Sequence, residues 1–595
     1  MTSSASATLN KIVPRPPPTA LVLIERIFLA LGALVVLALK LVYPFVLRFQ
    51  SDEPQHLHVV WGWARGLVPY RDVFDNHTPL FHLLCAPLFR ALGERADIVV
   101  PMRFAMIPLY CLTLWCVFKI SQALYSQRAA LWTTVATALV PVYFFTSSEF
   151  RTDDLWIVFW MLSLLALVVG KSSRPLPFWT GFFMGCAFAT SLKTSLLLGC
   201  LLAASACVGI FKLLQPGKEV EAAVSAAPTK PMDRRLTQTP LHWVRPLVSG
   251  ILGMLLIPLL IVLFFYFKGA FHDLYYCVVQ HNLLPGMGNS RPGLHSLRLP
   301  IAFPFLFGIG LAIFRYSEVP AVGARRALLF LTGTIYVMAL RSYWPLITDQ
   351  DYLPFVPLAC IVGTPLVLWA CDRTQVAAIR IGVPVIAILA LLWMTVIAHP
   401  FWQDDTRKQI QMIQDVLNLT KADEFVMDGK GETIFRKRPF YYALEGITLE
   451  RMDRKLIADT IVQRMIETET AVIHVSRLQK EASAFVKANY LPLGNLQILG
   501  QILHPEPAGS DPEAGSDAAK KNSDELCSFS IAVPSEYQIV SNDGPVSGTL
   551  DGMPVNGPRR LLAGKHELRI AGSHGPVALF WARAVERGYS PFKSP

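Results

Sequence analysis

The chain has 595 residues, of which 53% are hydrophobic and only 16% are charged, and its formal net charge is +11. Apolar runs recur over about the first two-thirds of the chain, which excludes a soluble globular protein and indicates a polytopic membrane protein. Many of the Lys and Arg residues lie in short loops between these runs, without a basic stripe or base-stacking module, so no nucleic acid is expected as a partner. The sequence holds neither a C-x-x-C nor an H-E-x-x-H motif and therefore predicts no metal motif of these kinds.

Eleven apolar runs are expected to cross the membrane as helices. They are 27–47, 101–118, 129–145, 155–169, 178–192, 195–211, 248–267, 300–314, 327–340, 352–370 and 381–398. Several are shorter than the ~20 residues that an untilted helix needs, so the helices are expected to extend into flanking residues, or two of the runs to form a tight hairpin around Lys193. The bias of basic residues places the tail 1–26 in the cytoplasm and the C-terminus outside, with 27–400 as the membrane domain.

The first outer loop, 48–100, combines acids, histidines and aromatic residues directly after an apolar run. Asp52 and Glu53 begin it, and the other candidate polar residues are His56, Tyr70, Arg71, Asp75 and His77. Two interfacial helices are expected, one with His56, Val59, Val60 and Trp63 on one face and one with Leu80, Leu83, Leu84 and Leu88. Such residues also serve as plain interfacial anchors, but charged groups at a membrane boundary favour a reaction site.

Further polar groups follow in the other outer loops. Asp153 and Asp154 stand where the third apolar run ends and the fourth begins, and Asp153 could alternatively be a helix N-cap. Lys193 lies at the next outward turn, where a cation can serve a lipid phosphate or act as an interfacial anchor. The remaining candidates are His281 and Arg291 in the loop 268–299 and Arg341 and Tyr352 near the tenth run.

The chain after residue 400 is expected to be soluble. An α/β domain is predicted at 401–503, with strands at 424–427 and 471–475 and helices at 406–419, 452–467 and 476–489. A low-complexity linker follows at 504–525, and then a small β domain at 526–595 with a hairpin turn at Asp551-Gly552. Nothing in this region looks like a catalytic constellation, so recognition or packing against the membrane domain is its expected role.

Together these residues resemble a known family. The carriers of the resemblance are the Asp52-Glu53 pair, the connector G-x-x-P-Y-R-D-x-F-D-N-H-T-P-L at 66–80, the acid after the third run, the lysine after the fifth, and Tyr352 with the prolines that follow it. They resemble the polytopic glycosyltransferases of GT-C fold, in the superfamily of protein O-mannosyltransferases and aminoarabinose (lipid A) transferases. The resemblance spans about 27–398. It implies an all-α membrane domain of about eleven helices, followed by an extracytoplasmic C-terminal α/β and β region.

The resemblance also implies roles. A sugar on a polyprenyl phosphate would be moved, with inversion, to an acceptor hydroxyl at the outer face of a bacterial cytoplasmic membrane. Asp52 would be the general base or acceptor-orienting carboxylate beside Glu53, and Asp153 or Asp154 the second acid. His77, Lys193, His281, Tyr352, Arg341 and Arg291 would lie near the donor phosphate, and His56, Tyr70, Arg71 and Asp75 near the acceptor or sugar. Where relatives commonly show Arg-Pro-Asp, this chain has Arg151-Thr152-Asp153, which leaves the choice of second acid open.

Several alternatives stay open at this point. The acceptor is a lipid, a protein or a polysaccharide, and a divalent metal between Asp52 and the phosphate is compatible with the spacing. A transporter or flippase of lipid-linked sugars would instead need charges near the middle of the membrane, whereas those here lie at its outer boundary. A non-catalytic envelope assembly protein would leave the acids unexplained.

Overall fold

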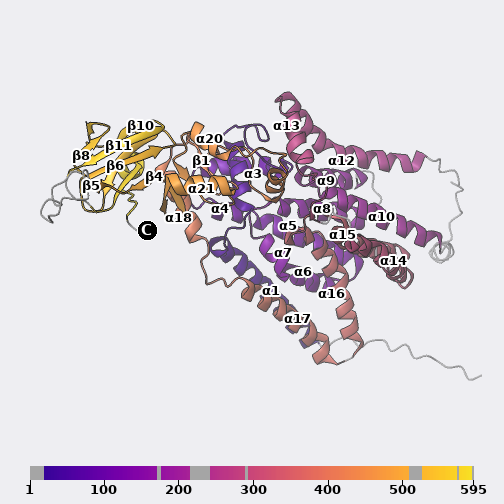
Figure 1. Cartoon of the computed structure of the whole chain (residues 1–595). Helices are drawn as coiled ribbons and strands as arrows, with labels where there is room; N and C mark the ends of the chain where they lie inside the picture. The colour runs from indigo at the N-terminus through magenta and orange to yellow at the C-terminus, as the bar shows by residue number, and fades with distance from the viewer. Residues whose placement is uncertain are drawn as a thin grey trace, which may run out of the picture.

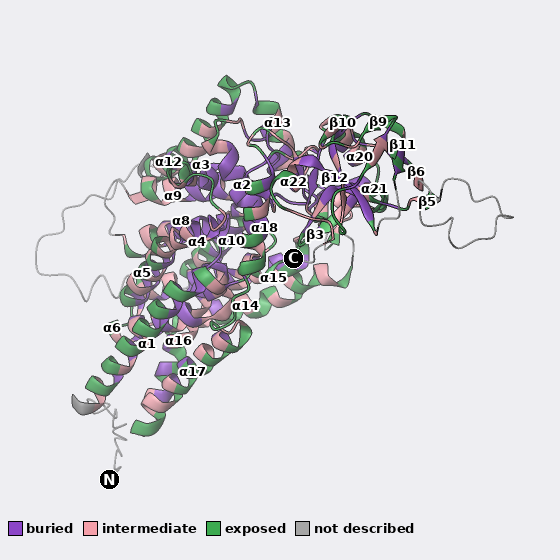
Figure 2. Ribbon diagram, turned by 90° about the vertical axis from the view of Figure 1, so that its left-hand side faces the viewer, coloured by how far each residue is buried: buried purple, intermediate pink, exposed green. Residues whose placement is uncertain are grey.

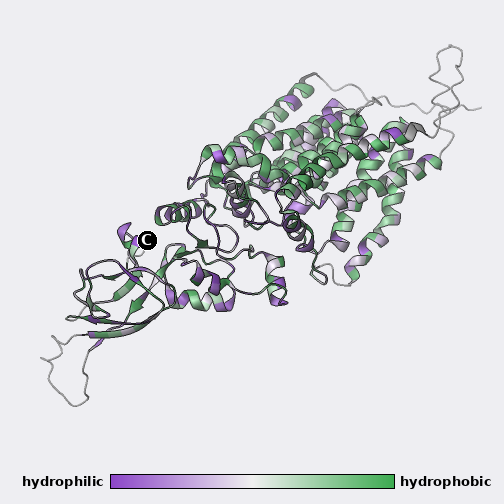
Figure 3. Cartoon of the chain, turned by 90° about the horizontal axis from the view of Figure 1, so that it is seen from above, coloured by the Kyte–Doolittle hydropathy of each residue, from purple (hydrophilic) through white to green (hydrophobic). Residues whose placement is uncertain are grey.

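The computed structural model describes residues 19–170, 176–214, 241–288, 293–374, 376–507, 525–571 and 575–592. A bundle of long helices is joined to a C-terminal region of strands and short helices (Figure 1). The bundle is largely hydrophobic, whereas hydrophobic and hydrophilic residues alternate in the C-terminal region (Figure 3). This contrast agrees with a membrane domain followed by a soluble region.

Nine helical spans in the described residues are long and apolar enough to cross a membrane. They belong to α1 (Thr19–Val46), α4 and α5 (Val99–Phe104 and Ile107–Leu124), α8 (Thr152–Val169), α10 (Thr194–Leu213), α12 (Leu241–Phe267), η3 and α14 (Leu294–Leu297 and Arg298–Arg315), α15 (Pro320–Tyr343), α16 (Phe355–Arg373) and α17 (Ala377–Ala398). Helix α1 begins at Thr19, before the first residue of the predicted apolar run 27–47.

Eleven spans were expected, and two of the expected runs do not form a single helix of that length, for separate reasons. The run 129–145 is divided into α6 (Gln127–Leu139) and α7 (Pro141–Thr146). Pro141 disfavours helical geometry at the residue before it, and Val140 is extended, with φ −62° and ψ 119°. The run 178–192 forms α9 (Leu176–Thr190), which has 15 residues and is too short for an untilted span.

Helix α9 packs closely against α12 through glycines. A Cβ atom on Gly181 would overlap the carbonyl oxygen of Gly250, and one on Gly185 would overlap that of Met254. Small residues four apart allow helix backbones to approach in this way, and packing of this kind drives helix association in membranes.

We expect Gly181→Val to separate α9 from α12 and to lower the midpoint of thermal unfolding in detergent, since overpacking costs about 1–3 kcal/mol or more. Gly199→Val in α10 is the matched control, because nothing lies within 4 Å of a Cβ at Gly199. Both substitutions place the same β-branched residue in a helix. Equal midpoints for the two variants would contradict this account of the α9–α12 contact.

The first outer loop forms two helices as predicted, α2 (Glu53–Ala64) and α3 (Leu80–Leu92). The prediction that both are interfacial is wrong for α2, because its residues from Glu53 to Gly62 are all buried. Purple, buried ribbon accordingly runs through α2 where the bundle meets the C-terminal region (Figure 2). Helix α3 does expose apolar side chains, namely Leu83, Leu84 and Leu88. Short helices also follow two of the long ones: α13 (Phe271–Tyr275) and η1 (Tyr276–Gln280) come after α12, and η4 (Asp349–Tyr352) comes after α15.

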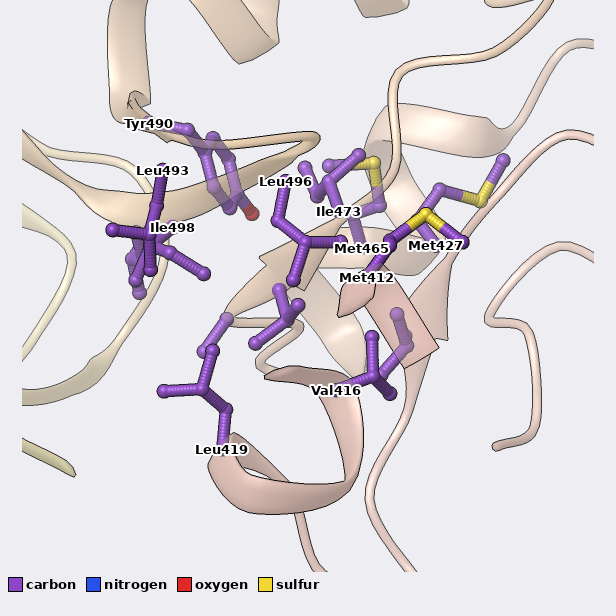
Figure 4. Packing of buried hydrophobic residues seen from close by; sticks show 14 of the residues in the cluster. Met412, Val416, Leu419, Met427, Met465, Ile473, Tyr490, Leu493, Leu496 and Ile498 are labelled. Carbon is purple, nitrogen blue, oxygen red and sulfur yellow. The ribbon is translucent and has the colours of Figure 1, made fainter. Parts of the chain in front are cut away.

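The C-terminal region begins as an α/β unit. Its elements are α18 (Arg407–Leu419), β1 (Val426–Met427), α19 (Gly446–Asp453), α20 (Ile461–Glu467), β2 (Val472–Ile473), α21 (Lys480–Asn489), β3 (Tyr490–Leu493) and β4 (Leu496–Leu503). Apolar side chains of α18, such as Val416 and Leu419, pack with residues of these strands (Figure 4). The predicted continuous helix 452–467 is wrong. Lys455, the second residue after α19, is in the left-handed region with φ 59°, a conformation that an α-helix does not continue through.

The two predicted soluble domains share one sheet. Strand β12 (Val577–Trp581) pairs antiparallel with β4 and with β7 (Ser535–Ser541), in the sheet order β1-β2-β4-β12-β7-β10 with β3 on β4. The remaining strands are β5 (Glu506–Pro507), β6 (Glu525–Ile531), β8 (Gly548–Leu550), β9 (Met553–Pro554), β10 (Arg559–Leu561) and β11 (Gly564–Ile570), and α22 (Ala582–Glu586) follows β12. The boundary between 503 and 526 therefore does not separate independent folds. Asp551 and Gly552 both have positive φ and join β8 to β9, which confirms the predicted hairpin turn. Most of the predicted linker lies outside the described residues.

Candidate active site

Asp52 occupies the N-cap position of α2 and is held by two cations. Its Oδ2 lies 2.6 Å from Nη2 of Arg151, which precedes α8, and its Oδ1 forms an ion pair with Lys430 of the C-terminal region. Burial raises the pKa of Asp52, but Arg151 and Lys430 outweigh burial and hold that pKa well below its usual range. Asp52 is therefore ionised at neutral pH and remains partly exposed, with a side-chain exposure of 22%.

Arg151 connects Asp52 to the other acids. Its guanidinium lies 3.2 Å from Glu149 and 3.3 Å from Asp153. Burial raises the pKa of Glu149 to about 8, and the opposing charge of Arg151 does not cancel that effect. Arg151 thus brings Asp52 into one network of ion pairs with Glu149 and Asp153, which lie about 100 positions further along the chain.

Lys193 lies directly before α10 and extends the same network. Its Nζ is 2.5 Å from Asp351 and 3.8 Å from Asp153. Burial lowers the pKa of Lys193, but these two carboxylates overcome burial and raise it. Asp351 is fixed by Thr348, whose backbone N–H and hydroxyl both donate to it. Lys193 is thus a charged ammonium group in a defined position.

Two more of the residues predicted near the donor phosphate, Arg341 and Tyr352, contact each other. Tyr352 follows Asp351, and its hydroxyl is 3.1 Å from Nη1 of Arg341. Both side chains belong to the η4 and α15 segments that border the Lys193–Asp351 pair.

The contacts distinguish the two candidate second acids. Asp153 bridges Arg151 and Lys193, whereas Asp154 is 2% exposed and forms no ion pair within the part of the chain that the structure describes. Asp153 is accordingly the better candidate for a role in the site.

Glu53 is placed differently from Asp52. Its two oxygens accept hydrogen bonds from Nε and Nη2 of Arg103, at 2.8 and 2.5 Å. They also accept from the backbone N–H groups of Phe150 and Gln50. Glu53 is fully buried. Its hydrogen bonds hold α2 against α4 and against the residues that precede α8. The predicted pairing of Glu53 with Asp52 as acids of one site receives no support from these contacts.

A histidine cluster lies one turn along α2 from Asp52. Asp75 Oδ1 accepts from Nδ1 of His77 at 2.9 Å, and Asp75 Oδ2 lies 3.2 Å from Nδ1 of His82. Nε2 of His82 is in turn 3.0 Å from Nδ1 of His56. Burial lowers the pKa of His82 to about 4 and the pKa of His56 well below its usual range. The structure thus brings His56, Asp75 and His77 together. His82 was not among the predicted site residues. Its only signal in the sequence is that it is a polar residue within the apolar first turn of α3.

Several predicted site residues lie elsewhere. Arg71 is exposed and pairs with Asp72 at 2.9 Å, which places it at the surface of the connector. Tyr70 is buried with φ 70°, and its hydroxyl donates to the His77 carbonyl at 2.7 Å, so it shapes the connector. His281 is buried and lies 3.0 Å from Glu445 of the C-terminal region. Arg291 is outside the described residues.

The C-terminal region contributes more to the site than the sequence indicated. Lys430 contacts Asp52, and the Tyr441 hydroxyl donates to the carbonyl of Tyr70. No local motif signals either contact, since both depend on residues more than 350 positions away.

An apolar cavity of about 380 Å³ lies between α9, α10, α12 and α13. Its lining includes Thr78, which follows His77, and Leu192, which precedes Lys193. Two residues of the cavity wall are therefore direct chain neighbours of the polar residues His77 and Lys193. Among the described residues, no group of three or more His, Cys, Asp or Glu is arranged to hold a metal ion.

Long apolar helices whose charged loops meet at one end, against a C-terminal region of strands and short helices, define a polytopic membrane protein. Residues 76–223 match the model of the family described as dolichyl-phosphate-mannose-protein mannosyltransferase. This matched segment contains Asp153 and Lys193, and it supports a glycosyltransferase. No curated protein matches the chain.

The fold is similar to two solved structures of ArnT from Cupriavidus metallidurans. The apo structure has a TM-score of 0.50 and 12% sequence identity, over 81% of this chain and 98% of that chain. The structure bound to undecaprenyl phosphate has the same TM-score at 13% identity, with the same coverage. Likeness at this identity establishes the fold, and with the family match it confirms the predicted resemblance to the GT-C superfamily.

Proposed function

We propose that this protein is an inverting glycosyltransferase that moves a sugar from a polyprenyl-phosphate donor to an acceptor hydroxyl at the outer face of a bacterial cytoplasmic membrane. The observation that carries the proposal is a chain of contacts from Asp52 through Arg151 and Asp153 to Lys193. It joins an ionised carboxylate to a cation whose neighbour in the chain, Leu192, lines an apolar cavity. A carboxylate can take the proton of an acceptor hydroxyl, and a cation can bind a lipid phosphate.

Asp52 would orient the acceptor and receive its proton. The acceptor oxygen would form a bond to the anomeric carbon while the bond from that carbon to the phosphate oxygen breaks. The electron pair would leave with the polyprenyl phosphate, and the hydroxyl proton would pass to Asp52. Assistance of this kind contributes about 10²–10⁴-fold.

Lys193 would stabilise the charge that the leaving phosphate gains, because a charged donor fixed in place interacts strongly with a developing anion. Arg341 donates to Tyr352, which follows the Lys193 partner Asp351 in the chain, and His77 directly precedes Thr78 of the cavity lining. The apolar cavity suits part of the polyprenyl chain. The lipid in the ArnT structure bound to undecaprenyl phosphate supports this class of donor. The acceptor would be a lipid, protein or polysaccharide hydroxyl.

We expect Lys193→Met to weaken binding of undecaprenyl phosphate in nanodiscs by about 10- to 100-fold, since a hydrogen bond to a charged group contributes about 1.5–3 kcal/mol. Lys193→Arg should retain much of the affinity. Lys268→Met, which removes an exposed lysine after α12, is the control and should bind like wild type. Unchanged binding by Lys193→Met would remove Lys193 from the donor site.

The function itself is tested by transfer of labelled sugar from membrane polyprenyl-phosphate pools by the purified wild-type protein. Formation of a labelled acceptor is expected. A protein that bound the lipid but moved no sugar with any donor and acceptor pool would contradict the proposal and favour the transporter alternative.

A further inference from the structure

The segment 428–434 of the C-terminal region forms a turn that is fixed by local hydrogen bonds and packs against α2. Asp428 accepts from the backbone N–H of Gly431 at 2.6 Å and of Thr433 at 2.8 Å, and from the Thr433 hydroxyl at 2.6 Å. The backbone N–H of Lys430 donates to Glu432 at 2.6 Å. Because these local bonds define the path of the turn, the Lys430 side chain projects from a fixed base.

The turn fits α2 closely. Gly431 has φ 83°, and a Cβ on it would lie 2.8 Å from Cβ of His58. His58 itself contacts the Ile434 carbonyl through Nδ1 at 2.8 Å. Only a glycine suits this position, both for its conformation and for its space. Arg436 further ties the segment to Glu94, at 3.0 Å.

Because the turn packs against α2, the Lys430 side chain reaches Asp52 at the start of that helix. The Lys430 side chain is 8% exposed and pairs with Oδ1 of Asp52, while Arg151 pairs with Oδ2. Each carboxylate oxygen therefore has its own cation, one from the membrane domain and one from the soluble region. Two cations on opposite oxygens fix the plane of a carboxylate as well as its charge.

We propose that Lys430 is a positioning residue of the active site, which holds the Asp52 carboxylate against Arg151 in the orientation required for sugar transfer. This inference rests on the proposed function. It makes the soluble region an integral part of the site, whereas the sequence indicated only recognition or packing. Loss of Lys430 leaves Asp52 with one cation, Arg151, and removes the cation that holds its Oδ1 atom.

The test is the rate of sugar transfer by full-length variants. Lys430→Met should lower kcat by roughly 10²-fold, as small misplacements of a reacting group do, with little change in the KM for the donor. Lys430→Arg should restore most of the rate. Lys437→Met, which removes an exposed lysine of the same segment, should be unaffected.

The pH profile separates positioning from a merely structural role. The charged and titratable groups facing Asp52 are Arg151, Lys430 and His56. Removing Lys430 takes away one cation that lowers the pKa of Asp52, so the acid limb of log(kcat/KM) should move to higher pH in Lys430→Met. An unchanged rate and profile in this variant would overturn the inference.

A second measurement does not depend on the reaction. Thermal unfolding midpoints of Asp52→Asn, Lys430→Met and the double variant form a cycle that isolates the pair. If the residues act together, the double variant should be no less stable than the less stable single variant. Additive losses would overturn the inference. Absence of transfer by the wild-type protein would contradict the proposed function alone, and this cycle would then decide whether Lys430 holds Asp52.

Discussion

Asp52→Asn is expected to lower sugar transfer by about 10²–10⁴-fold, the usual contribution of a positioned proton acceptor. An amide has almost the same shape as the carboxylate but can neither accept the acceptor's proton nor carry the charge that Arg151 and Lys430 face. The measurement is the transfer rate at saturating donor, with the thermal unfolding midpoint recorded for the same preparation. Binding of the polyprenyl phosphate should be nearly unchanged, because Lys193 and its neighbours are untouched.

Asp72→Asn provides a matched control for this substitution. Asp72 lies in the same outer loop, is 27% exposed and pairs with the surface residue Arg71. It should transfer sugar like wild type. If Asp52→Asn also kept the wild-type rate in a folded protein, Asp52 would not be the proton acceptor, and Asp153 would become the acid to test.

Arg103→Met is expected to have the largest effect on stability. Arg103 binds both oxygens of Glu53 and also donates to the carbonyls of Leu47 at 2.6 Å and Arg48 at 3.0 Å. All of these groups are at the junction of α1, α2 and α4. Removing Arg103 leaves the buried Glu53 carboxylate without its cation, which costs about 3–5 kcal/mol. The midpoint of thermal unfolding in detergent and the yield of monodisperse protein should both fall.

Arg95→Met supplies the comparison, because Arg95 pairs with Asp97 in the same loop but is 45% exposed. Exposed pairs of this kind contribute about 0–1 kcal/mol, so its midpoint should stay close to wild type. Equal losses in both variants would show that the Glu53–Arg103 pair has no special structural role.

Much of the helical domain could be predicted from composition. Every expected apolar run coincides with helix, because backbone polar groups in lipid must be paired within the segment itself. Two runs, 129–145 and 178–192, do not form single helices of spanning length, because the first is interrupted before Pro141 and the second gives a helix of only 15 residues. The interruption at Pro141 is a local effect visible in the sequence. The close contact of α9 with α12 is a property of two helices packed together.

The sequence by itself determined which polar residues stand at the ends of apolar runs, and so placed Asp52, Asp153, Lys193 and Tyr352 at the same end of the bundle. Their partners were decided by the tertiary structure. Asp153 rather than Asp154 meets Lys193, Glu53 is enclosed by Arg103, and Lys430 reaches Asp52 from 378 positions away. The physical reason is that hydrophobic periodicity is local, whereas an ion pair needs only two side chains within about 4 Å, which packing alone brings about.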